Sequence, residues 1–401
     1  MTRRNAATAA VLALLACAPA IARAQQQPTY PNVKFKGRLQ TEFRTSDIQS
    51  TNADGTPAAV NTVVSNEFFL RRFYVEADGY LAPSVRVKME LNATRRAVNL
   101  EDAWVDVGLG RFLTWRVGQE KKPVERQELV SSSLYPTVER GAQIAGMRNQ
   151  NLVSENNFLT AAGFASHDIG TSLEVHTADS AAIPVSLRVG VWTGQGKDNP
   201  EVNNAKTFGG RLQVAPIAKL SVGVSFVSHD DSISVPVTTP AGTTKVIAAD
   251  SAGRSTAFGL DAEWGKVNSD GLHLIADASI GKEGRAGAFT STLAGLRAAA
   301  PGTGFSPRFR TLHLVGEYRI PLANTGTLTG IGPVLRFDRT EPDTDNDVGS
   351  TLVTPGVNLY FGRNAWLMVN YDVVMPGDRL DLGRGAGEAV HSFKTMLRVF
   401  F

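Results

Sequence analysis

The chain has 401 residues, of which 42% are hydrophobic and 20% are charged, and its formal net charge is +3. That small basic excess gives no support to binding of nucleic acid, and the single cysteine excludes an intramolecular disulfide. No run of about 18 apolar residues follows the N-terminal segment, which excludes membrane-spanning helices.

The first 24 residues have the pattern of a secretory signal peptide. Two arginines precede an apolar stretch from Ala6 to Ala20, and Ala22-Arg23-Ala24 forms a cleavage site. We therefore expect export and removal of residues 1–24. An alternative cleavage before Cys17 would give a lipoprotein, but the cleavage site at Ala24 is better placed. Cleavage at Ala24 removes three arginines and no acid, so the 41 basic residues become 38, equal to the 38 acidic ones.

The segment from Val33 to Arg44 predicts a strand with one apolar and one ionic face. Its odd positions are apolar or small and its even positions are charged or polar, which is the period of an extended chain. One such strand would suit a soluble β-sandwich equally well. Similar alternation returns at Val85–Asn92, Asp102–Val107, Leu113–Val117, Val185–Trp192, Phe208–Val214, Leu220–Phe226, Phe258–Trp264, His273–Ile280, Arg310–Arg319, Leu335–Arg339, Ala365–Val373 and Val390–Phe401.

The connections between these segments alternate between brief turns and long polar loops. Turns rich in Gly, Pro and Asn, such as 81–83 and 361–364, occupy every second connection. Short turns at one end and long loops at the other are typical of outer-membrane barrels. We predict an all-β protein, a transmembrane antiparallel β-barrel of about 16 strands formed by residues 25–401. The predicted long loops are 46–65, 120–166, 193–206, 230–254, 283–308, 341–349 and 376–387.

The last predicted strand ends at Phe401. A barrel in lipid must pair this strand with the first one, because an open edge would leave backbone groups without hydrogen bonds. A terminal aromatic residue resembles the signature of outer-membrane barrels. We therefore expect the protein in the outer membrane of a Gram-negative-type cell envelope, with membrane lipid as a partner.

The segment from Val117 to Arg140 loses the strand period at Lys121-Lys122-Pro123 and does not regain it until about Ser166. A loop of this length in a compact domain needs a functional or disorder explanation. We expect residues 120–166 to be the third long loop, folded into the barrel as a constriction. Lys121 and Lys122 are candidate anion-binding residues at its start.

Several motifs, in this order, resemble the phosphate-selective porin O and P family. They are Phe69–Gly79, Leu100–Val105, Val117–Gln119, Ser131-Ser132, Glu139-Arg140, His167–Gly170, Arg188–Gly196 and Asn203–Lys206. The resemblance implies a trimer of 16-stranded barrels whose third long loop enters the lumen and whose lumen binds anions. On matching positions, it assigns the anion site to Arg38, Arg71, Arg72, Asp102, Ser131, Ser132 and Arg140.

These residue types suit a permeable anion site on chemical grounds. Arginine keeps its charge and offers a planar fork of donors to an oxyanion, while serine hydroxyls are neutral donors. A pore must also release what it binds. Because Arg71 breaks the alternation set by Phe69 and Phe73, we predict that one of the two adjacent arginines lies on a bulge or above the lipid.

One residue departs from the family pattern. The family is expected to have a lysine three residues before the paired serines, where this chain has Glu128. Acidic residues in the loop also balance its basic ones. We therefore expect phosphate selectivity to be weak.

No motif for a metal, a cofactor or catalysis stands out. The histidines are scattered singly, and Ser166-His167-Asp168 is only an adjacent triplet. We predict a porin, not an enzyme, that allows passive diffusion of small anions, with phosphate or polyphosphate as candidate solutes. A non-selective general porin, an outer-membrane barrel hydrolase and a secreted β-sandwich or adhesin stay open as alternatives.

Overall fold

The computed structural model describes residues 29–50, 63–94, 97–178, 180–199, 206–230, 233–239, 242–248, 254–283, 308–323, 326–344 and 348–401. The expected signal peptide lies outside these ranges, so its removal stays a prediction. No helix among the described residues is long and apolar enough to cross a membrane.

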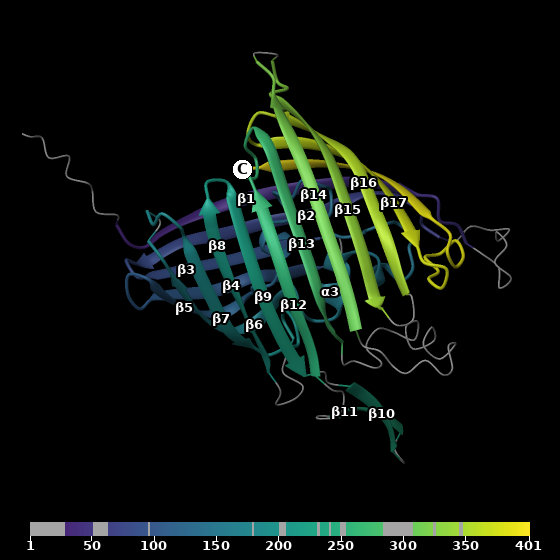
Figure 1. The fold of residues 1–401 in the computed structure, drawn as a ribbon, viewed down its shortest axis with the longest axis horizontal. Helices are drawn as coiled ribbons and strands as arrows, with labels where there is room; N and C mark the ends of the chain where they lie inside the picture. Colours follow the sequence, from purple (N-terminus) through teal and green to yellow (C-terminus); the bar gives the residue numbers. More distant parts are fainter. Residues whose placement is uncertain are drawn as a thin grey trace, which may run out of the picture.

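Sixteen antiparallel strands form one closed barrel (Figure 1). They are β1 (Asn32–Ser46), β2 (Asn66–Ala82), β3 (Val85–Ala93), β4 (Val98–Gly108), β5 (Leu113–Lys121), β6 (His167–His176), β7 (Val185–Trp192), β8 (Thr207–Ile217), β9 (Leu220–Asp230), β12 (Arg254–Trp264), β13 (Gly271–Lys282), β14 (Arg308–Pro321), β15 (Gly330–Asp343), β16 (Val348–Phe361), β17 (Ala365–Pro376) and β18 (Val390–Phe400). The prediction of an antiparallel barrel of about 16 strands is confirmed.

Two of the predicted loops contain or border strands that the sequence pattern did not indicate. The connection from β9 to β12 contains β10 (Ile233–Thr239) and β11 (Gly242–Ala248), which pair only with each other. The prediction of a long loop over 341–349 is wrong. Here β15 continues through a register shift after Thr340 to Asp343, and β16 begins at Val348.

The barrel closes by pairing β1 with β18, as predicted. The register runs from Arg38 opposite Phe400 to Ser46 opposite Ser392. Beyond β18, Phe401 exchanges two backbone hydrogen bonds with Gly37, of 2.7 and 3.0 Å. Its ring lies directly over Gly37, so a larger residue at position 37 would have to displace the ring.

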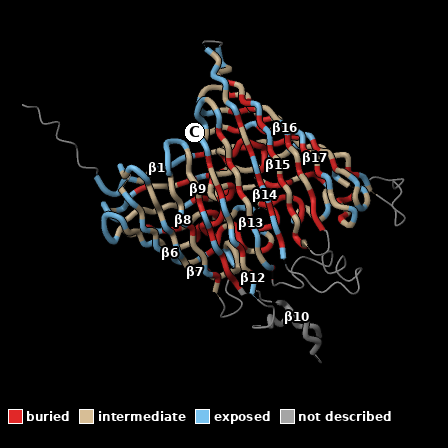
Figure 2. The backbone as a smooth tube through the Cα atoms, viewed as in Figure 1, coloured by how far each residue is buried: buried red, intermediate tan, exposed pale blue. Residues whose placement is uncertain are grey.

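The two faces of the wall differ as the alternation predicts. Outward positions carry exposed apolar side chains, for example Phe35, Phe68, Phe258 and Leu335. The inward positions between them are buried and often charged, so buried and exposed residues alternate along the strands in Figure 2. This pattern gives the barrel an apolar outer surface and a polar interior.

The inward face of β13–β18 is not uniformly polar, which the strand pattern did not indicate. Three apolar groups lie there among charged residues. The first contains Ile275, Val315 and Val334 on β13–β15, and the second contains Tyr360, Trp366, Met368 and Met396 on β16–β18. The third includes Phe309 of β14 with Val348 and Leu352 of β16. Apolar side chains on an otherwise polar inner face need a partner, and the segment between β5 and β6 supplies it.

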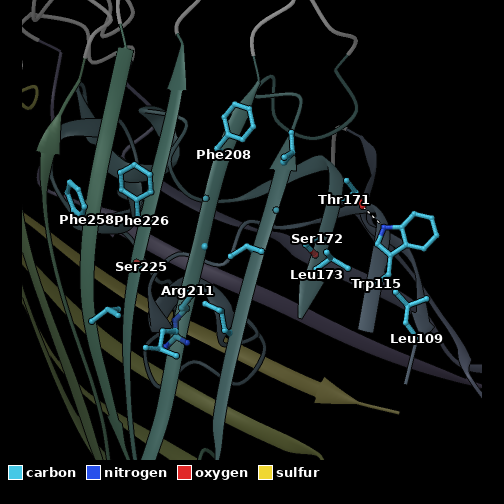
Figure 3. Close-up of a pocket in the computed structure, with 18 residues that line it drawn as sticks. Leu109, Trp115, Thr171, Ser172, Leu173, Phe208, Arg211, Ser225, Phe226 and Phe258 are labelled. Atoms are coloured by element: carbon cyan, nitrogen blue, oxygen red, sulfur yellow. Dashed lines mark hydrogen bonds between the residues drawn. The ribbon is translucent and has the colours of Figure 1, made fainter. Parts of the chain in front are cut away.

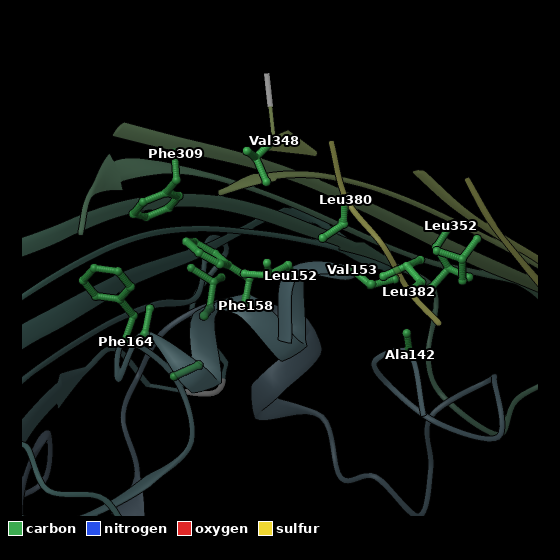
Figure 4. Close-up of a cluster of buried hydrophobic side chains, with 14 of the residues drawn as sticks. Ala142, Leu152, Val153, Phe158, Phe164, Phe309, Val348, Leu352, Leu380 and Leu382 are labelled. Carbon is green, nitrogen blue, oxygen red and sulfur yellow. The ribbon is translucent and has the colours of Figure 1, made fainter. Parts of the chain in front are cut away.

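That segment, 122–166, contains the helices α2 (Arg126–Leu129), η1 (Gln150–Leu152) and α3 (Glu155–Ala161). Phe158 and Phe164 from its second half pack against Phe309 of β14, while Leu152 and Val153 lie in the same apolar cluster as Val348 and Leu352 of β16 (Figure 4). The segment thus has its own apolar contacts with the inward side of the wall.

Candidate pore site between the loop segment and strands β1–β4

The first half of the 122–166 segment is fixed against β13–β18 by apolar packing. Val130 and Tyr135 pack with Ile275 and Val315, while Val138 packs with Trp366 and the two methionines near it. The Tyr135 hydroxyl also lies 2.5 Å from Nε2 of His313 on β14.

Hydrogen bonds from inward polar side chains reinforce this packing. Asn370 Oδ1 accepts from the Val138 amide at 2.6 Å, and Arg336 Nη1 donates to the carbonyls of Glu139 and Arg140 at 2.8 Å. Arg398 Nη1 donates to the Ser133 carbonyl at 2.8 Å. Buried arginines therefore satisfy backbone carbonyls of an irregular segment, which would otherwise be costly to bury.

A second anchor lies at the start of the segment, around Glu125. This residue has φ 56° and ψ 145°, an unfavourable conformation for a side chain other than glycine. Its carboxyl group accepts a hydrogen bond from Ser279 on β13. Asp277, two residues earlier on the same strand, accepts a hydrogen bond from the Arg126 amide at 2.6 Å. The strain is thus held by hydrogen bonds to the wall.

Glu155 completes a group of acids at this anchor. Its two carboxyl oxygens accept hydrogen bonds from Gln127 at 2.6 Å and from Thr311 at 2.5 Å. Burial raises the pKa of Glu125 to about 7, and burial together with the Glu125 charge raises the pKa of Glu155 well above its ordinary value. These two side chains therefore hold the segment best when they are protonated.

The other side of the segment faces a cavity of about 820 Å³, whose opposite wall is built by β1–β4. Eight of the nine residues predicted as an anion site line this cavity. They are Arg38, Arg71, Arg72, Asp102, Lys121, Ser131, Ser132 and Arg140. The structure thus brings together residues that are up to about a hundred positions apart in the chain.

Lys122 does not line the cavity, which corrects its predicted role. Its side chain is buried, and its Nζ donates to the Gly163 carbonyl at 2.7 Å and lies 3.3 Å from Asp168. Lys122 therefore joins the start of the segment to its end. Neighbouring lysines diverge here because Lys121 is the last residue of β5 and the chain turns away from the wall after it.

Arg71 is the extra residue of a β-bulge, in agreement with its break in the alternation. Gln40 of β1 pairs with Arg72 and the next residue, Thr41, pairs with Leu70. The bulge turns both arginines to the same side, where both contact Glu139 of the segment; Arg72 Nη2 lies 2.9 Å from Glu139 Oε2. Burial opposes ionisation of Glu139, but the two arginines outweigh it and hold its pKa below the ordinary range.

Glu128 lies between the two basic residues of this part of the cavity. Its carboxylate oxygens are 3.6 Å from Lys121 Nζ and 3.4 Å from Arg140 Nη1, and Asn156 donates to it at 2.8 Å. Burial opposes ionisation, but Arg140 and Lys121 lower the pKa of Glu128 to about 2. Glu128 therefore stays ionised and offsets part of the positive charge, as its departure from the family pattern indicated.

The β1–β4 side of the cavity is a ladder of ion pairs. Arg38 bridges to the segment by donating to Ser131 Oγ at 3.1 Å. Asp102 accepts from Lys88 at 2.6 Å and lies 3.4 Å from His167, so its carboxylate positions these two side chains. Lys36, which the alternation of the first strand placed in the lumen, also lines the cavity. Further lining residues that the sequence interpretation did not assign are Lys88, Lys197, His167, Glu76, Glu90 and Glu101. For the lining residues on β1–β3, the sequence did contain a signal, because they occupy the even, polar positions of the alternating pattern.

Basic residues exceed acidic ones along the cavity. Its described lining includes eight lysines and arginines against five aspartates and glutamates, a difference of three. A mixed but net positive lining in a confined space favours anions over cations.

A larger cavity of about 950 Å³ lies on the other face of the wall, over β6–β9. Figure 3 shows Phe208, Phe226, Phe258 and Leu173 pointing away from the barrel interior, with the Trp115 indole donating to Thr171 at 2.7 Å. The apolar lining places this hollow on the outer surface of the barrel, outside the candidate pore site.

Comparison with known proteins agrees with this geometry. An anion-selective porin from Comamonas acidovorans has a similar structure, with a TM-score of 0.56 and 12% identity over 92% of this chain and 99% of its own. OmpT, an outer membrane protein of Vibrio cholerae in trimer form, gives 0.53 and 14% over 92% and 99%. The outer membrane channel DcaP of Acinetobacter baumannii gives 0.52 and 11% over 92% and 97%. No curated protein matches the chain in sequence.

The fold and the lined cavity define the class: the chain has the fold of outer-membrane porins, a closed antiparallel β-barrel of 16 strands. Within that class, residues 45–235 match the model of the family described as phosphate-selective porin O and P. The resemblance inferred from the sequence motifs is thereby confirmed over that range.

Proposed function

We propose that the chain forms a water-filled channel that prefers small anions and that residues 122–166 are its constriction. The observation that carries the proposal is the cavity between this segment and β1–β4, with its excess of basic side chains. The family description supports phosphate as one solute, and the Comamonas neighbour is itself described as anion-selective.

Recording from planar bilayers tests the proposal. Purified protein should give stepwise, ohmic conductance, and a potassium chloride gradient should give a reversal potential that favours chloride. Phosphate should block chloride current partially, because Glu128 offsets part of the positive charge. Equal permeability to both ions would leave a general porin, and a preference for potassium would contradict the anion proposal.

A barrel hydrolase is the second candidate, supported by His167, which lies 3.4 Å from Asp102 in a cavity that serines also line. A catalytic triad needs a serine hydroxyl hydrogen-bonded to such a histidine. Here Ser131 Oγ accepts from Arg38. Hydrolysis of phospholipid or peptide by protein that gives no conductance would favour this candidate.

We also infer that the protein assembles as a homotrimer and that residues 1–24 are removed on export. The trimer form of the Vibrio neighbour and the implied family assembly support the first inference. Light scattering of the detergent-solubilised protein should give three chains per particle, and mass spectrometry should place the mature N-terminus at Gln25. A monodisperse monomer or a retained Met1 would contradict them.

A further inference from the structure

A smaller hollow adjoins the channel cavity within the 122–166 segment. Its volume is about 280 Å³, and we call it the amide recess. Five of its six lining residues carry an amide or a hydroxyl group. They are Gln143, Asn151, Asn156, Asn157 and Thr160, and the sixth is Ala161. None of these six described residues is charged, so the recess differs in chemistry from the cavity beside it.

Asn157 gives the amide recess a fixed side. Its side chain is 9% exposed, and its Nδ2 donates to the carbonyls of Ala142 at 2.7 Å and Gln150 at 2.8 Å. The next residue of α3, Phe158, is fully buried and packs against Phe309 of β14. α3 is therefore joined both to the barrel wall and to the rest of the segment.

Three other lining side chains keep their hydrogen-bonding groups available. Gln143, Asn151 and Thr160 make no side-chain hydrogen bond to another residue that the structure describes. Gln143 is half-buried, and the other two are exposed. Amides and hydroxyls both donate and accept, which is the capacity that the hydroxyl groups of a solute require.

Two residues connect the amide recess to the basic residues of the channel. Asn156 and Thr160 line both hollows. Asn156 Nδ2 also donates to Glu128 at 2.8 Å, and Glu128 contacts both Lys121 and Arg140. A solute whose anionic group lies at these two basic residues therefore has its neutral part within reach of the recess.

The amide recess lies toward the long loops. Gln143 also lines a third hollow, of about 570 Å³, together with Arg44 and Glu67 at the loop ends of β1 and β2. Arg44 Nη1 donates to the Gln143 carbonyl at 3.4 Å. A solute that enters from the loop end thus meets neutral groups before it meets the charged cavity.

We propose that the amide recess binds the hydroxylated part of a sugar phosphate whose phosphate group lies at Lys121 and Arg140. The proposal rests on the anion channel proposed above and adds phosphate esters of sugars to its solutes. A volume of about 280 Å³ holds roughly nine waters at about 30 Å³ each, which is enough space for one monosaccharide. Neutral amides hold such a solute without an added charge that would slow its release.

Block of chloride current in planar bilayers at about pH 8, where phosphate esters are dianions, tests this assignment. Glucose 6-phosphate should block at a concentration about fivefold lower than cyclohexylmethyl phosphate does, which is the effect of about one net hydrogen bond. The second ester carries the same phosphate group on a ring of the same size without hydroxyls. Glucose, which lacks the phosphate, should not block at these concentrations.

The recess variant Gln143→Met, Asn151→Leu removes two amides and nearly keeps the size of both side chains. Neither residue lines the channel cavity, so block by inorganic phosphate should stay unchanged while the difference between the two esters disappears. The matched control Gln195→Met, Asn199→Leu removes two amides from the β7–β8 connection that line neither hollow, and it should keep the difference. The folded band on unboiled gels shows that each variant has formed its barrel.

Equal block by the two esters, an unchanged difference in the recess variant, an equal loss in the control variant or equal block by glucose would each overturn the assignment. Absence of block by both esters would overturn it as well. All these outcomes compare blockers, whereas failure of the anion channel itself would appear in the reversal potential. A reversal potential that favours chloride together with equal block by both esters would therefore reject the recess site and leave the channel proposal intact.

Discussion

At the scale of single residues, Glu128 offsets positive charge in the cavity. Its carboxylate contacts Lys121 and Arg140, and its pKa of about 2 keeps it ionised over the whole physiological range. Lys121, Arg140 and Glu128 together therefore carry one positive charge less than the two basic residues alone would.

Glu128→Gln should shift selectivity toward anions. Loss of the carboxylate leaves Lys121 and Arg140 uncompensated while the amide keeps its size, so the ratio of chloride to potassium permeability should rise by a factor of about 2 or more. Reversal potentials in a salt gradient measure this ratio. Glu388→Gln, which removes an exposed acid from the β17–β18 loop, is the matched control. An equal shift in both variants would mean that Glu128 does not act from within the pore.

Arg140→Ala should raise single-channel conductance and weaken block by phosphate. The Arg140 side chain fills space beside Ser131 and Ser132 and donates to the Val130 carbonyl, so truncation both widens the cavity and removes a charge. Conductance in symmetric chloride, with and without added phosphate, reports the two effects. Arg148→Ala, which changes a more exposed arginine farther along the same segment, should leave both quantities unchanged. Unaltered conductance in Arg140→Ala would move the constriction elsewhere.

Local sequence pattern predicted some residue positions and missed others for physical reasons. The bulge at Arg71 was predictable because the break in alternation is confined to neighbouring residues. The buried position of Lys122 was not predictable, since its partners Gly163 and Asp168 lie more than forty positions away. The cavity-lining role of Lys197 likewise depends on a contact with Glu101 that spans 96 positions.

At the scale of elements, the 122–166 segment is the connection between β5 and β6, and it packs against the inner face of the closed barrel. Three contacts with the wall fix it: apolar packing at Tyr135, packing of Phe158 and Phe164 against Phe309, and the acid anchor at Glu125 and Glu155. The apolar residues inside β13–β18 interrupt the polar inner face because they face this segment. Strand periodicity shows that such residues point inward, but it does not identify their partner.

The segment should be held more firmly at acidic than at alkaline pH. The docked state raises the pKa of Glu125 from 4.5 to about 7, so docking binds a proton, and this stabilisation is full below about pH 4.5 and lost as pH rises through 7. Single-channel records should show more frequent conductance fluctuations at pH 8 than at pH 5. Limited proteolysis within 122–166 should follow the same trend.

Glu125→Gln should remove most of this pH dependence, because an amide cannot ionise. Glu128→Gln in the same segment should keep it, since Glu128 is ionised at both pH values. Fluctuations that depend on pH equally in both variants would assign the effect to other groups around the anchor, which include Glu155, Asp277, Asp261, His313 and Asp338.

At the scale of the whole molecule, the barrel was the most predictable feature. Period-two alternation and the alternation of short and long connections both repeat along the entire chain, so errors at single segments such as 341–349 did not affect the architecture. The lumen was less predictable, because its shape depends on which inward residues meet the 122–166 segment across the barrel.

Removal of Phe401 should lower the thermal stability of the barrel more than Phe401→Ala does. Deletion leaves the Gly37 amide and carbonyl without their partners at the lipid boundary, whereas alanine loses the ring over Gly37 but keeps both backbone hydrogen bonds. Loss of the folded band on unboiled gels with rising temperature measures the difference. Equal midpoints for the two variants would show that the ring, rather than the backbone pairing, carries the stabilisation.

The pairing of β1 with β18 also limits when the barrel can close during folding. The neighbours Gly37 and Phe401 are the beginning and end of the barrel sequence, so the last seam joins the most distant parts of the chain. Contacts of such high sequence separation form slowly. The seam cannot form before β18 has been synthesised, and until then both edge strands need protection from pairing with other chains.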